Sequence, residues 1–413
     1  MKNDSRIMFN SPELSGGRSA IEEILRSGAQ MMLQQALENE IAGFLEAHSC
    51  VTLEDGRQTV VRNGFMPARD IQTGIGPLTI KQPRVRDRAK NVLFTSKILP
   101  PFMRRVPSIN TLIPILYLKG ISTGDMQETL ESLLGPQAKG LSAANIVRLK
   151  QQWEAEHQAW SARDLSEKEY VYWWVDGIYF NVRLSPERPC ILVIMGATAE
   201  GKKEIVSVYD GIRESKISWE EVLRDLKHRG LKAGPRLAIG DGALGFWAAL
   251  EEEFPNTRLQ RCWVHKTANI LDKMPKSVQP HAKKLIHEMY MAPKRKDALK
   301  AYDEFLHIYS AKYPKAVECL VKDKDVLFTF YDYPAQHWMH IRTTNPIEST
   351  FATVRHRTRQ TKGCGSRLAT ISMVFKLCLE AEKRWRRLRG SNLIAKVLQW
   401  VKFTDGEIEE QAA

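Results

Sequence analysis

Long apolar runs are missing from this chain of 413 residues. The best one, Leu112–Leu118, is far shorter than the roughly 20 residues that a membrane-spanning helix needs. Met1–Gly17 has no apolar core of a secretory signal, and internal repeats and low-complexity tracts are also missing. The six cysteines are scattered without a disulfide framework, which is typical of a reducing compartment. We therefore expect a soluble, cytoplasmic protein without a membrane partner.

Acidic residues are scarce in two blocks of the chain, whose net charge is +13 at pH 7. Thr52–Asn110 holds 11 Lys and Arg against 4 Asp and Glu, a net of +7, and Arg342–Arg389 holds 12 against 3, a net of +9. These two nets leave the rest of the chain near −3. Clustered positive charge indicates a polyanion such as nucleic acid as the partner, although a solvated basic surface explains either block alone. Hydrophobic residues make up 43% of the chain, which is enough for folded cores.

Changes of pattern along the chain predict six segments. Apolar residues recur at helical spacing over Ser19–His48, and this helix either packs as plain core or serves dimerisation. The predicted segments are an N-terminal helix (1–50), a small β-rich basic segment (51–110), a helix-turn-helix-like DNA-binding domain (111–165), an α/β catalytic domain (166–265 and 342–365), a helical region between its two parts (266–341), and a C-terminal helix with a short tail (366–413).

Basic residues in the first half are candidates for DNA contact. Gly76–Arg88 predicts a strand that leads into a basic arm, and such an arm could lie along a phosphate backbone. The three short helices predicted in 111–160 are joined by Gly-containing turns, as in a helix-turn-helix. A generic helical bundle with a polar face explains the same pattern. The side chains that would face DNA are Arg84, Arg86, Arg88, Arg148 and Lys150.

The chain changes to alternating strands and helices after Glu169. The predicted order is β-β-β-α-β-α-β, which indicates an α/β core. A helical stretch follows, and Pro346 at a first helical position starts another helix that runs to Gln360. The predicted strands are 170–183, 190–198, 203–209, 236–239 and 257–262, and the predicted helices include 219–228, 244–254, 265–313, 344–360 and 368–388, before a frayed acidic tail.

Three acidic residues lie where this pattern makes them useful. Asp176 and Asp241 each follow a buried strand and precede a glycine, and Glu348 lies in the first turn of the helix that begins at Pro346. A strand that delivers a carboxylate at its C-terminal end is a common way to build a site. Phosphodiester transfer uses two hard cations held by a few carboxylates. An Asp in this setting is also often a turn residue or a helix cap, and the spacing alone does not decide between these roles.

Four motifs resemble the bacterial Mutator-type insertion-sequence transposases, and the resemblance covers nearly the whole chain. It is least close between Gly211 and Trp219, where Lys216 replaces an expected acidic or small residue. The motifs are Val175-Asp-Gly-Ile-Tyr-Phe-Asn-Val-Arg183, Ile239-Gly-Asp-Gly-Ala-Leu-Gly-Phe246, Gln260-Arg-Cys-Trp-Val-His265 and Arg342-Thr-Thr-Asn-Pro-Ile-Glu-Ser-Thr-Phe-Ala-Thr-Val-Arg355.

This resemblance implies a ribonuclease-H-like catalytic core that is interrupted by an all-helical insertion and preceded by a mainly helical DNA-binding region. It makes Asp176, Asp241 and Glu348 the catalytic D-D-E triad, which would hold two Mg²⁺ ions, with Mn²⁺ as a substitute. The implied enzyme binds the terminal inverted repeats of an insertion sequence, cleaves DNA and transfers the freed 3′ end to target DNA. The family also implies replicative excision through a circular intermediate. A homodimer in the bacterial cytosol, associated with the nucleoid, is expected because both element ends must be held together.

Further residues of these motifs have two interpretations each. Cys262 and His265 match the family's C-x-x-H signature, and because zinc needs four ligands we expect a structural role near the site. Trp338 either stacks on an unpaired DNA base or is a core residue. A basic group around the Glu motif contacts phosphate or forms a solvated face. Its members are Arg342, Arg355, Arg357, Arg359 and Lys362.

Two other functions are compatible with the same residues. A ribonuclease-H-like junction nuclease would cut structured DNA without strand transfer, and the basic helix-turn-helix-like region argues against it. A non-catalytic DNA-binding protein derived from a transposase would bind DNA without metal, and the complete triad argues against it. The sequence therefore predicts a metal-dependent DNA transposase.

Overall fold

The computed structural model describes residues 20–122, 124–134, 143–180, 190–242, 244–360 and 366–409. The chain divides into two compact units, Met1–Ile146 and Val147–Ala413. Within the described ranges, no helix combines the length and the apolar character that crossing a bilayer requires.

The first unit is built around one long helix, which confirms the helix predicted at the N-terminus. Leu33 and Leu37 of this helix pack on the apolar side of the β2–β3 hairpin, against Ile71, Leu78 and Ile80. A second two-stranded sheet pairs β1 with β4. The elements are α1 (Ala20–Ala47), β1 (Val60–Phe65), β2 (Arg69–Thr73), β3 (Gly76–Ile80), β4 (Pro83–Asp87), α2 (Pro107–Lys119) and α3 (Met126–Leu134).

The predicted basic arm is in fact a strand as far as Asp87. β4 pairs antiparallel with β1, so the backbone of this segment is engaged in a sheet. Pro83, which has no N–H to donate, stands at the first position of the strand, where proline is tolerated. The alternation of side chains leaves Arg84 and Arg86 exposed, and Arg88 is exposed just beyond the strand. The predicted arm was wrong in its backbone conformation, whereas its arginines do face solvent.

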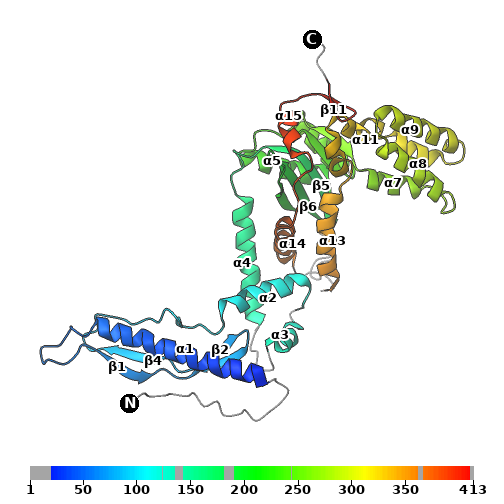
Figure 1. Ribbon diagram of the computed structural model, residues 1–413. Helices are drawn as coiled ribbons and strands as arrows, with labels where there is room; N and C mark the ends of the chain where they lie inside the picture. Colours follow the sequence, from blue (N-terminus) through cyan, green and yellow to red (C-terminus); the bar gives the residue numbers. More distant parts are fainter. Residues whose placement is uncertain are drawn as a thin grey trace. The chain divides into compact units, whose positions relative to one another are not determined.

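The second unit contains a five-stranded mixed sheet of order β7-β6-β5-β8-β9 (Figure 1). β5 runs parallel to β8, and β8 runs parallel to β9, whereas β6 is antiparallel to both of its neighbours. The predicted β-β-β-α-β-α-β order is confirmed. Its elements are α4 (Ala143–Ser161), which crosses the division between the units, β5 (Tyr170–Tyr179), β6 (Cys190–Thr198), β7 (Lys203–Gly211), α5 (Lys216–His228), β8 (Leu237–Gly240), α6 (Leu244–Glu253) and β9 (Arg258–Arg261).

One face of the sheet is covered by α5 and α6. Alternate side chains of β5, such as Trp173 and Val175, point into a core with Trp219 of α5 and Phe246 of α6. Ser215 caps α5 by accepting a hydrogen bond from the backbone N–H of Ser218. This core joins β5 and β8 to both helices.

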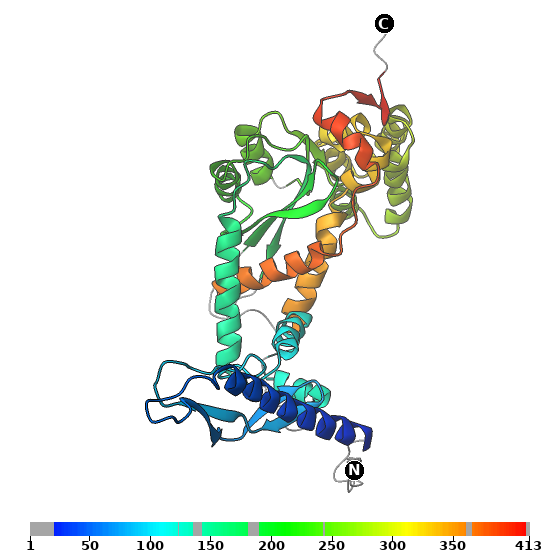
Figure 2. The same cartoon turned by 60° about the vertical axis from the view of Figure 1, so that its left-hand side comes forward.

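The other face of the sheet receives segments from the last third of the chain. The Tyr172 hydroxyl lies 2.7 Å from Nδ1 of His337, and Trp174 Nε1 donates to the carbonyl of His340 at 2.8 Å. Figure 2 shows α14 crossing α13. The elements after β9 are α7 (Trp263–Leu271), α8 (Gln279–Met291), α9 (Arg295–Tyr309), α10 (Pro314–Val321), α11 (Lys324–Leu327), the 3-10 helices η1 (Thr329–Asp332) and η2 (Ala335–His337), α12 (Trp338–Ile341), α13 (Asn345–Gln360), α14 (Arg367–Glu382), η3 (Ser391–Leu393), α15 (Ile394–Leu398), β10 (Phe403–Thr404) and β11 (Glu407–Ile408).

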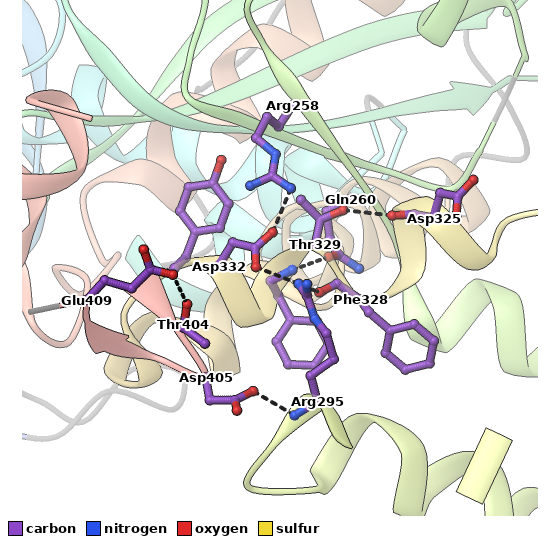
Figure 3. Close-up of polar contacts among 12 residues, drawn as sticks. Arg258, Gln260, Arg295, Asp325, Phe328, Thr329, Asp332, Thr404, Asp405 and Glu409 are labelled. Atoms are coloured by element: carbon purple, nitrogen blue, oxygen red, sulfur yellow. Dashed lines mark hydrogen bonds and ion pairs between the residues drawn. The ribbon is translucent and has the colours of Figure 1, made fainter. Parts of the chain in front are cut away.

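The elements between β9 and α13 are all helices, as predicted. Polar side chains connect this stretch to β9, the edge strand of the sheet. Gln260 is fully buried; its amide donates to the carbonyl of Leu327 and accepts from the N–H of Phe330. Figure 3 shows Asp332 between Arg258 of β9 and Arg295 of α9, each 2.6 Å away. These contacts fix the helical stretch to the edge strand.

Two predicted features near the C-terminus were wrong. The last long helix ends at Glu382, not at Leu388. Lys383 begins a run of like charges, which disfavours further helix. The N–H of Leu388 donates to the carbonyl of Gly201 instead of to a helical carbonyl. The tail is not frayed as far as residue 409. β10 and β11 form a hairpin, and Asp405 accepts a hydrogen bond from the backbone N–H of Arg295 (Figure 3).

Candidate catalytic site

Two of the predicted acids lie side by side on neighbouring parallel strands: Asp176 lies within β5, three residues before its end, and Asp241 directly follows β8. Trp174 of β5 pairs with Ile239 of β8, so two residues further on Asp176 lies level with Asp241. The register of β8 with β9 places Cys262 in the same row, and its N–H donates to the carbonyl of Gly240. Parallel strands bring their carboxyl ends to one edge of a sheet, so this row lines a single edge.

Glu348 reaches this edge because the start of α13 is tied to Cys262. The backbone N–H of Thr344 donates to Cys262 Sγ at 3.2 Å, and its hydroxyl donates to Glu348 Oε1 at 2.6 Å. The same hydroxyl lies 3.3 Å from Nδ1 of His265, which is itself 3.6 Å from Glu348 Oε1. Thr344 is fully buried, so the contacts are shielded from water. Glu348 is therefore tied through Thr344 to Cys262, which stands in the row of Asp176 and Asp241.

The carboxylates influence one another's charge. Burial, together with the neighbouring Asp241, raises the pKa of Asp176 to about 7, and the charge of Glu214 adds to this rise. Burial and Asp241 likewise raise the pKa of Glu214 to about 7. Crowded, half-buried carboxylates disfavour full ionisation, and a bound cation relieves that repulsion.

A positive group balances this negative edge. A hydrogen bond with the Cys262 thiol, aided by the charges of Glu348 and Asp176, raises the pKa of His265 to about 9. Burial opposes ionisation of Cys262, but hydrogen bonds with His265 and Thr344 outweigh it and lower the pKa of the thiol. His265 is thus held as a cation beside Glu348 at neutral pH.

Both glycines that follow the aspartates are required by close approaches. Gly242 has a φ of +86°, which favours glycine, and a Cβ there would overlap the Arg261 guanidinium. A Cβ on Gly177 would overlap the carboxylate of Glu214. The glycines therefore allow side chains from other elements to reach the ends of β5 and β8.

The donor atoms of this edge suit hard divalent cations. Asp176, Asp241 and Glu348 offer only carboxylate oxygens, which Mg²⁺ and Mn²⁺ prefer. Among the residues that the structure describes, the group of three potential ligands whose atoms all lie within 4.8 Å of one another is Cys262, His265 and Glu348, and neither Asp176 nor Asp241 belongs to it. A structural zinc site takes four ligands, and the Cys262 sulfur already accepts hydrogen bonds from Thr344. By donor chemistry the three carboxylates suit a hard cation, although the group that lies close together in this structure includes only one of them, Glu348.

The predicted DNA-contacting side chains fall into two groups. Arg355 and Arg148 are exposed, and Lys150 is half-buried. Trp338 is only 9% exposed and donates to the carbonyl of Tyr333, so it lies in an aromatic core. Arg357 is also buried, at 1% exposed, and the Arg342 guanidinium points inward to the carbonyl of Tyr290. The side chains of Arg359 and Lys362 lie outside the described residues.

DNA contact by the inward-facing members would require them to become exposed. Trp338 and Arg357 are held inside the protein, and Arg342 is half-buried with its charge 5.5 Å from the centre of the Tyr290 ring. In helix α13, the predicted shared face of Glu348 and Arg355 leaves Arg357 on the opposite, packed side. Charge alone could not distinguish these two sides of the helix.

Sequence reasoning did not single out Thr344 and Glu214. Thr344 lies in the long motif around Glu348, and its position four residues before that glutamate on a helix start was an available signal. Glu214 lies in the segment where the family resemblance is least close, so no motif marked it. Only the fold shows that it approaches Gly177.

The raised pKa of Asp176 predicts a pH-dependent stability difference in the metal-free protein. Asp176 binds its proton more tightly in the folded chain, so its contribution to stability falls as pH rises from about 4 to about 7. We expect metal-free Asp176→Asn to be more stable than the wild type at pH 8, by on the order of 2 kcal/mol. The difference in stability between Asp176→Asn and the wild type should narrow towards pH 4. Thermal unfolding in EDTA measures it, and an Asp176→Asn variant no more stable at pH 8 would contradict this environment.

The fold and the site together define an α/β protein with carboxylates at one edge of a mixed sheet. The sequence pattern of the transposase Mutator family matches residues 9–388. The chain therefore belongs to the Mutator family of transposases.

Individual relatives agree with this membership. The chain is 52% identical over 303 residues to the transposase for insertion sequence element IS6120 of Mycolicibacterium smegmatis, covering 73% of this chain and 93% of that protein. It is 54% identical over 283 residues to the transposase for insertion sequence element IST2 of Acidithiobacillus ferrooxidans, covering 68% and 95%. The transposase for IS905 of Lactococcus lactis is 27% identical, with coverage of 82% and 84%.

A likeness among solved structures is much weaker. A chain of the simian T-cell lymphotropic virus intasome, in complex with PP2A regulatory subunit B56 gamma, is 12% identical with a TM-score of 0.16. It covers 36% of this chain and 46% of that chain. A likeness this slight does not establish a shared fold.

Proposed function

We propose that this protein is a metal-dependent DNA transposase that binds the terminal inverted repeats of an insertion sequence, cleaves at their ends and transfers the freed strand. The observation that carries the proposal is the row formed by Asp176 and Asp241, which Glu348 joins through Thr344 and Cys262. Family membership supplies the reaction class, cutting and joining of DNA.

The proposed architecture is a ribonuclease-H-like core interrupted by a helical insertion. The sheet and its α5 and α6 helices would form the core, and the helices between β9 and α13 would form the insertion. Supporting this, Cys262, shortly before the predicted insertion (266–341), and Thr344, shortly after it, are in contact. The chain thus leaves and re-enters the core at one point.

Each side chain at the edge has a distinct task in this proposal. Asp176, Asp241 and Glu348 would hold two Mg²⁺ ions, for which Mn²⁺ would substitute. Bound divalent cations would activate the attacking oxygen and stabilise the leaving oxygen. Thr344 orients the Glu348 carboxylate, and His265 offsets negative charge beside it. One site would serve cleavage and strand transfer in turn, because both replace one oxygen on phosphorus by another.

Binding of two element ends calls for basic surface and for a second copy of the chain. Arg84, Arg86 and Arg88 are exposed along β4 and just beyond it, and they would contact DNA phosphates. A homodimer would hold both ends together. The first half of α1 exposes Ile21 at 70% and Met32 at 70%, which offers apolar surface for pairing. Such an enzyme would act in the bacterial cytosol, at the nucleoid.

The experiment is a cleavage and joining assay with the element's own ends. Inverted repeats flanking the gene define the labelled duplex, which is incubated with the full chain in Mg²⁺, Mn²⁺ or EDTA. We expect metal-dependent nicks at the element end and slower-migrating joined products. Nicks confined to branched DNA, without joining, would instead favour a junction nuclease. Gel shifts that are indifferent to metal, with no nicking, would favour a non-catalytic DNA-binding protein.

The Thr344 hydroxyl predicts a graded loss of activity. Thr344→Val keeps the shape of the side chain but removes the bond to Glu348 Oε1. Groups that orient metal ligands are typically worth about 10–100-fold, so we expect cleavage to slow by about that factor. Thr344→Ser, which keeps the hydroxyl, should stay within a few-fold of the wild type. Equal rates for Thr344→Val and the wild type would show that the hydroxyl does not position Glu348.

A further inference from the structure

A fourth carboxylate reaches the edge where Asp176 and Asp241 meet. Glu214 lies between the end of β7 and Ser215, the cap of α5. Its carboxylate occupies the space that a Cβ on Gly177 would fill, directly beside Asp176 in the chain. Glu214 is only partly exposed. An acidic side chain is thus directed at the proposed metal-binding edge from an element outside the known triad.

The backbone around Glu214 lies between β5, which carries Asp176, and helix α6, which follows Asp241. Its N–H lies 3.4 Å from the Tyr179 hydroxyl of β5. On the other side, Gly245 at the start of α6 approaches the Glu214 carbonyl so closely that a Cβ there would lie 2.8 Å away. The segment is therefore wedged between the continuation of β5 and the helix that follows Asp241.

The described neighbours of the Glu214 carboxylate include no Lys or Arg partner, although the positive charge of His265 acts on it and lowers its pKa against the effect of Asp241. The Cys190 thiol donates a long hydrogen bond to Glu214 Oε1 at 3.9 Å. Among the residues that the structure describes, no Lys or Arg forms an ion pair with Glu214, whereas Lys216 pairs with Glu220 and Glu252. A half-buried carboxylate without a Lys or Arg partner, close to other carboxylates, is stabilised by a bound cation.

We propose that Glu214 is a fourth acidic residue of the catalytic site and binds the same divalent cation as Asp176 and Asp241. This inference rests on the proposed function, because it assumes that these two aspartates hold the cation. Glu214 would complete the cation's oxygen ligands from the side opposite to α13.

Metal binding tests this proposal without relying on activity. Mn²⁺ is titrated into the full chain by calorimetry for the wild type, Glu214→Gln and Glu251→Gln, a matched change at an exposed glutamate of α6. We expect Glu214→Gln to weaken Mn²⁺ binding by about tenfold or more, and Glu251→Gln to leave it unchanged. Mn²⁺ binding by Glu214→Gln that equals the wild type would overturn the role of Glu214.

A second variant distinguishes metal binding from a merely structural role. Gly177→Ala keeps Glu214 but displaces its carboxylate, so it should weaken Mn²⁺ binding in the same direction. If both changes act through one carboxylate, their effects will not add in the double variant. Additive losses would count against the proposal.

The controls separate this inference from the proposed function. If the wild type binds Mn²⁺, Asp176→Asn loses it and Glu214→Gln keeps it, then only the role of Glu214 fails. If the wild type itself does not bind Mn²⁺, the metal site of the proposed function fails as well. Circular dichroism of each variant checks that the fold is retained.

Discussion

Asp176→Asn, Asp241→Asn and Glu348→Gln should each reduce DNA cleavage by on the order of 1000-fold or more, since groups that act as one catalytic unit fail together. The reason is the shared edge: each amide keeps the shape of the side chain but removes a negative ligand from the same cation site. Cleavage and strand transfer should fall together, because one site performs both. Binding of end DNA should be retained or become slightly tighter, because negative charge is removed.

A labelled-end cleavage assay at saturating protein measures this loss, with gel shifts on the same samples to report binding. Glu251→Gln, an exposed glutamate of α6, is the matched control and should cleave like the wild type. Wild-type rates for any one of the three variants would remove that residue from the catalytic set.

Asp323→Ala should lower the stability of the second unit more than any surface substitution. Asp323 lies 2.6 Å from Lys266 Nζ and 3.1 Å from Arg261 Nε, and both cations are almost fully buried. Removing the carboxylate that Lys266 and Arg261 share leaves both buried cations without this partner. The free energy of unfolding should fall by on the order of 3 kcal/mol. For a unit of this size, that corresponds to a fall of roughly 5–10 °C in the unfolding midpoint.

This loss should also reach the catalytic edge. Arg261 is the last residue of the edge strand β9 and lies against Gly242, next to Asp241. Differential scanning calorimetry measures the midpoint, and Asp325→Asn, an exposed acid two residues away, serves as the control. A midpoint for Asp323→Ala within 1–2 °C of that control, which is roughly what a sub-kcal/mol change gives, would show that the buried cations find other partners.

The residue pattern within a segment was enough to predict a helix or strand where the segment's own residues determine its structure. The start of helix α13 at Asn345 differs from the prediction by one residue, and the helix continues through the described residues to Gln360. Pro346 marks its first turn, and apolar residues then recur at helical spacing. Strand β6 also matches its prediction, since a continuous apolar run bounded by turns is typical of a central strand. The two aspartates could be recognised by the same logic, as acids at the ends of buried strands.

Long-range pairing could not be derived in the same way. The basic segment of β4 is a strand only because β1 pairs with it, and nothing within Pro83–Asp87 states that partner. The burial of Arg357 depends on which side of α13 packs against the rest of the unit. Thr344 and Glu214 acquire their roles from residues dozens of positions away, Cys262 and Gly177. The spacing of residues along the chain does not predict such contacts.

Iron-directed backbone cleavage tests most directly whether one cation site joins the three carboxylates. Fe²⁺ takes the place of Mg²⁺, and with ascorbate and peroxide it generates radicals that cut the backbone next to the bound ion. The account predicts cuts near Asp176, Asp241 and Glu348 together, suppressed by excess Mg²⁺ and lost in Asp241→Asn. Cuts confined to other segments, or cuts at these three that persist in Asp241→Asn, would contradict it.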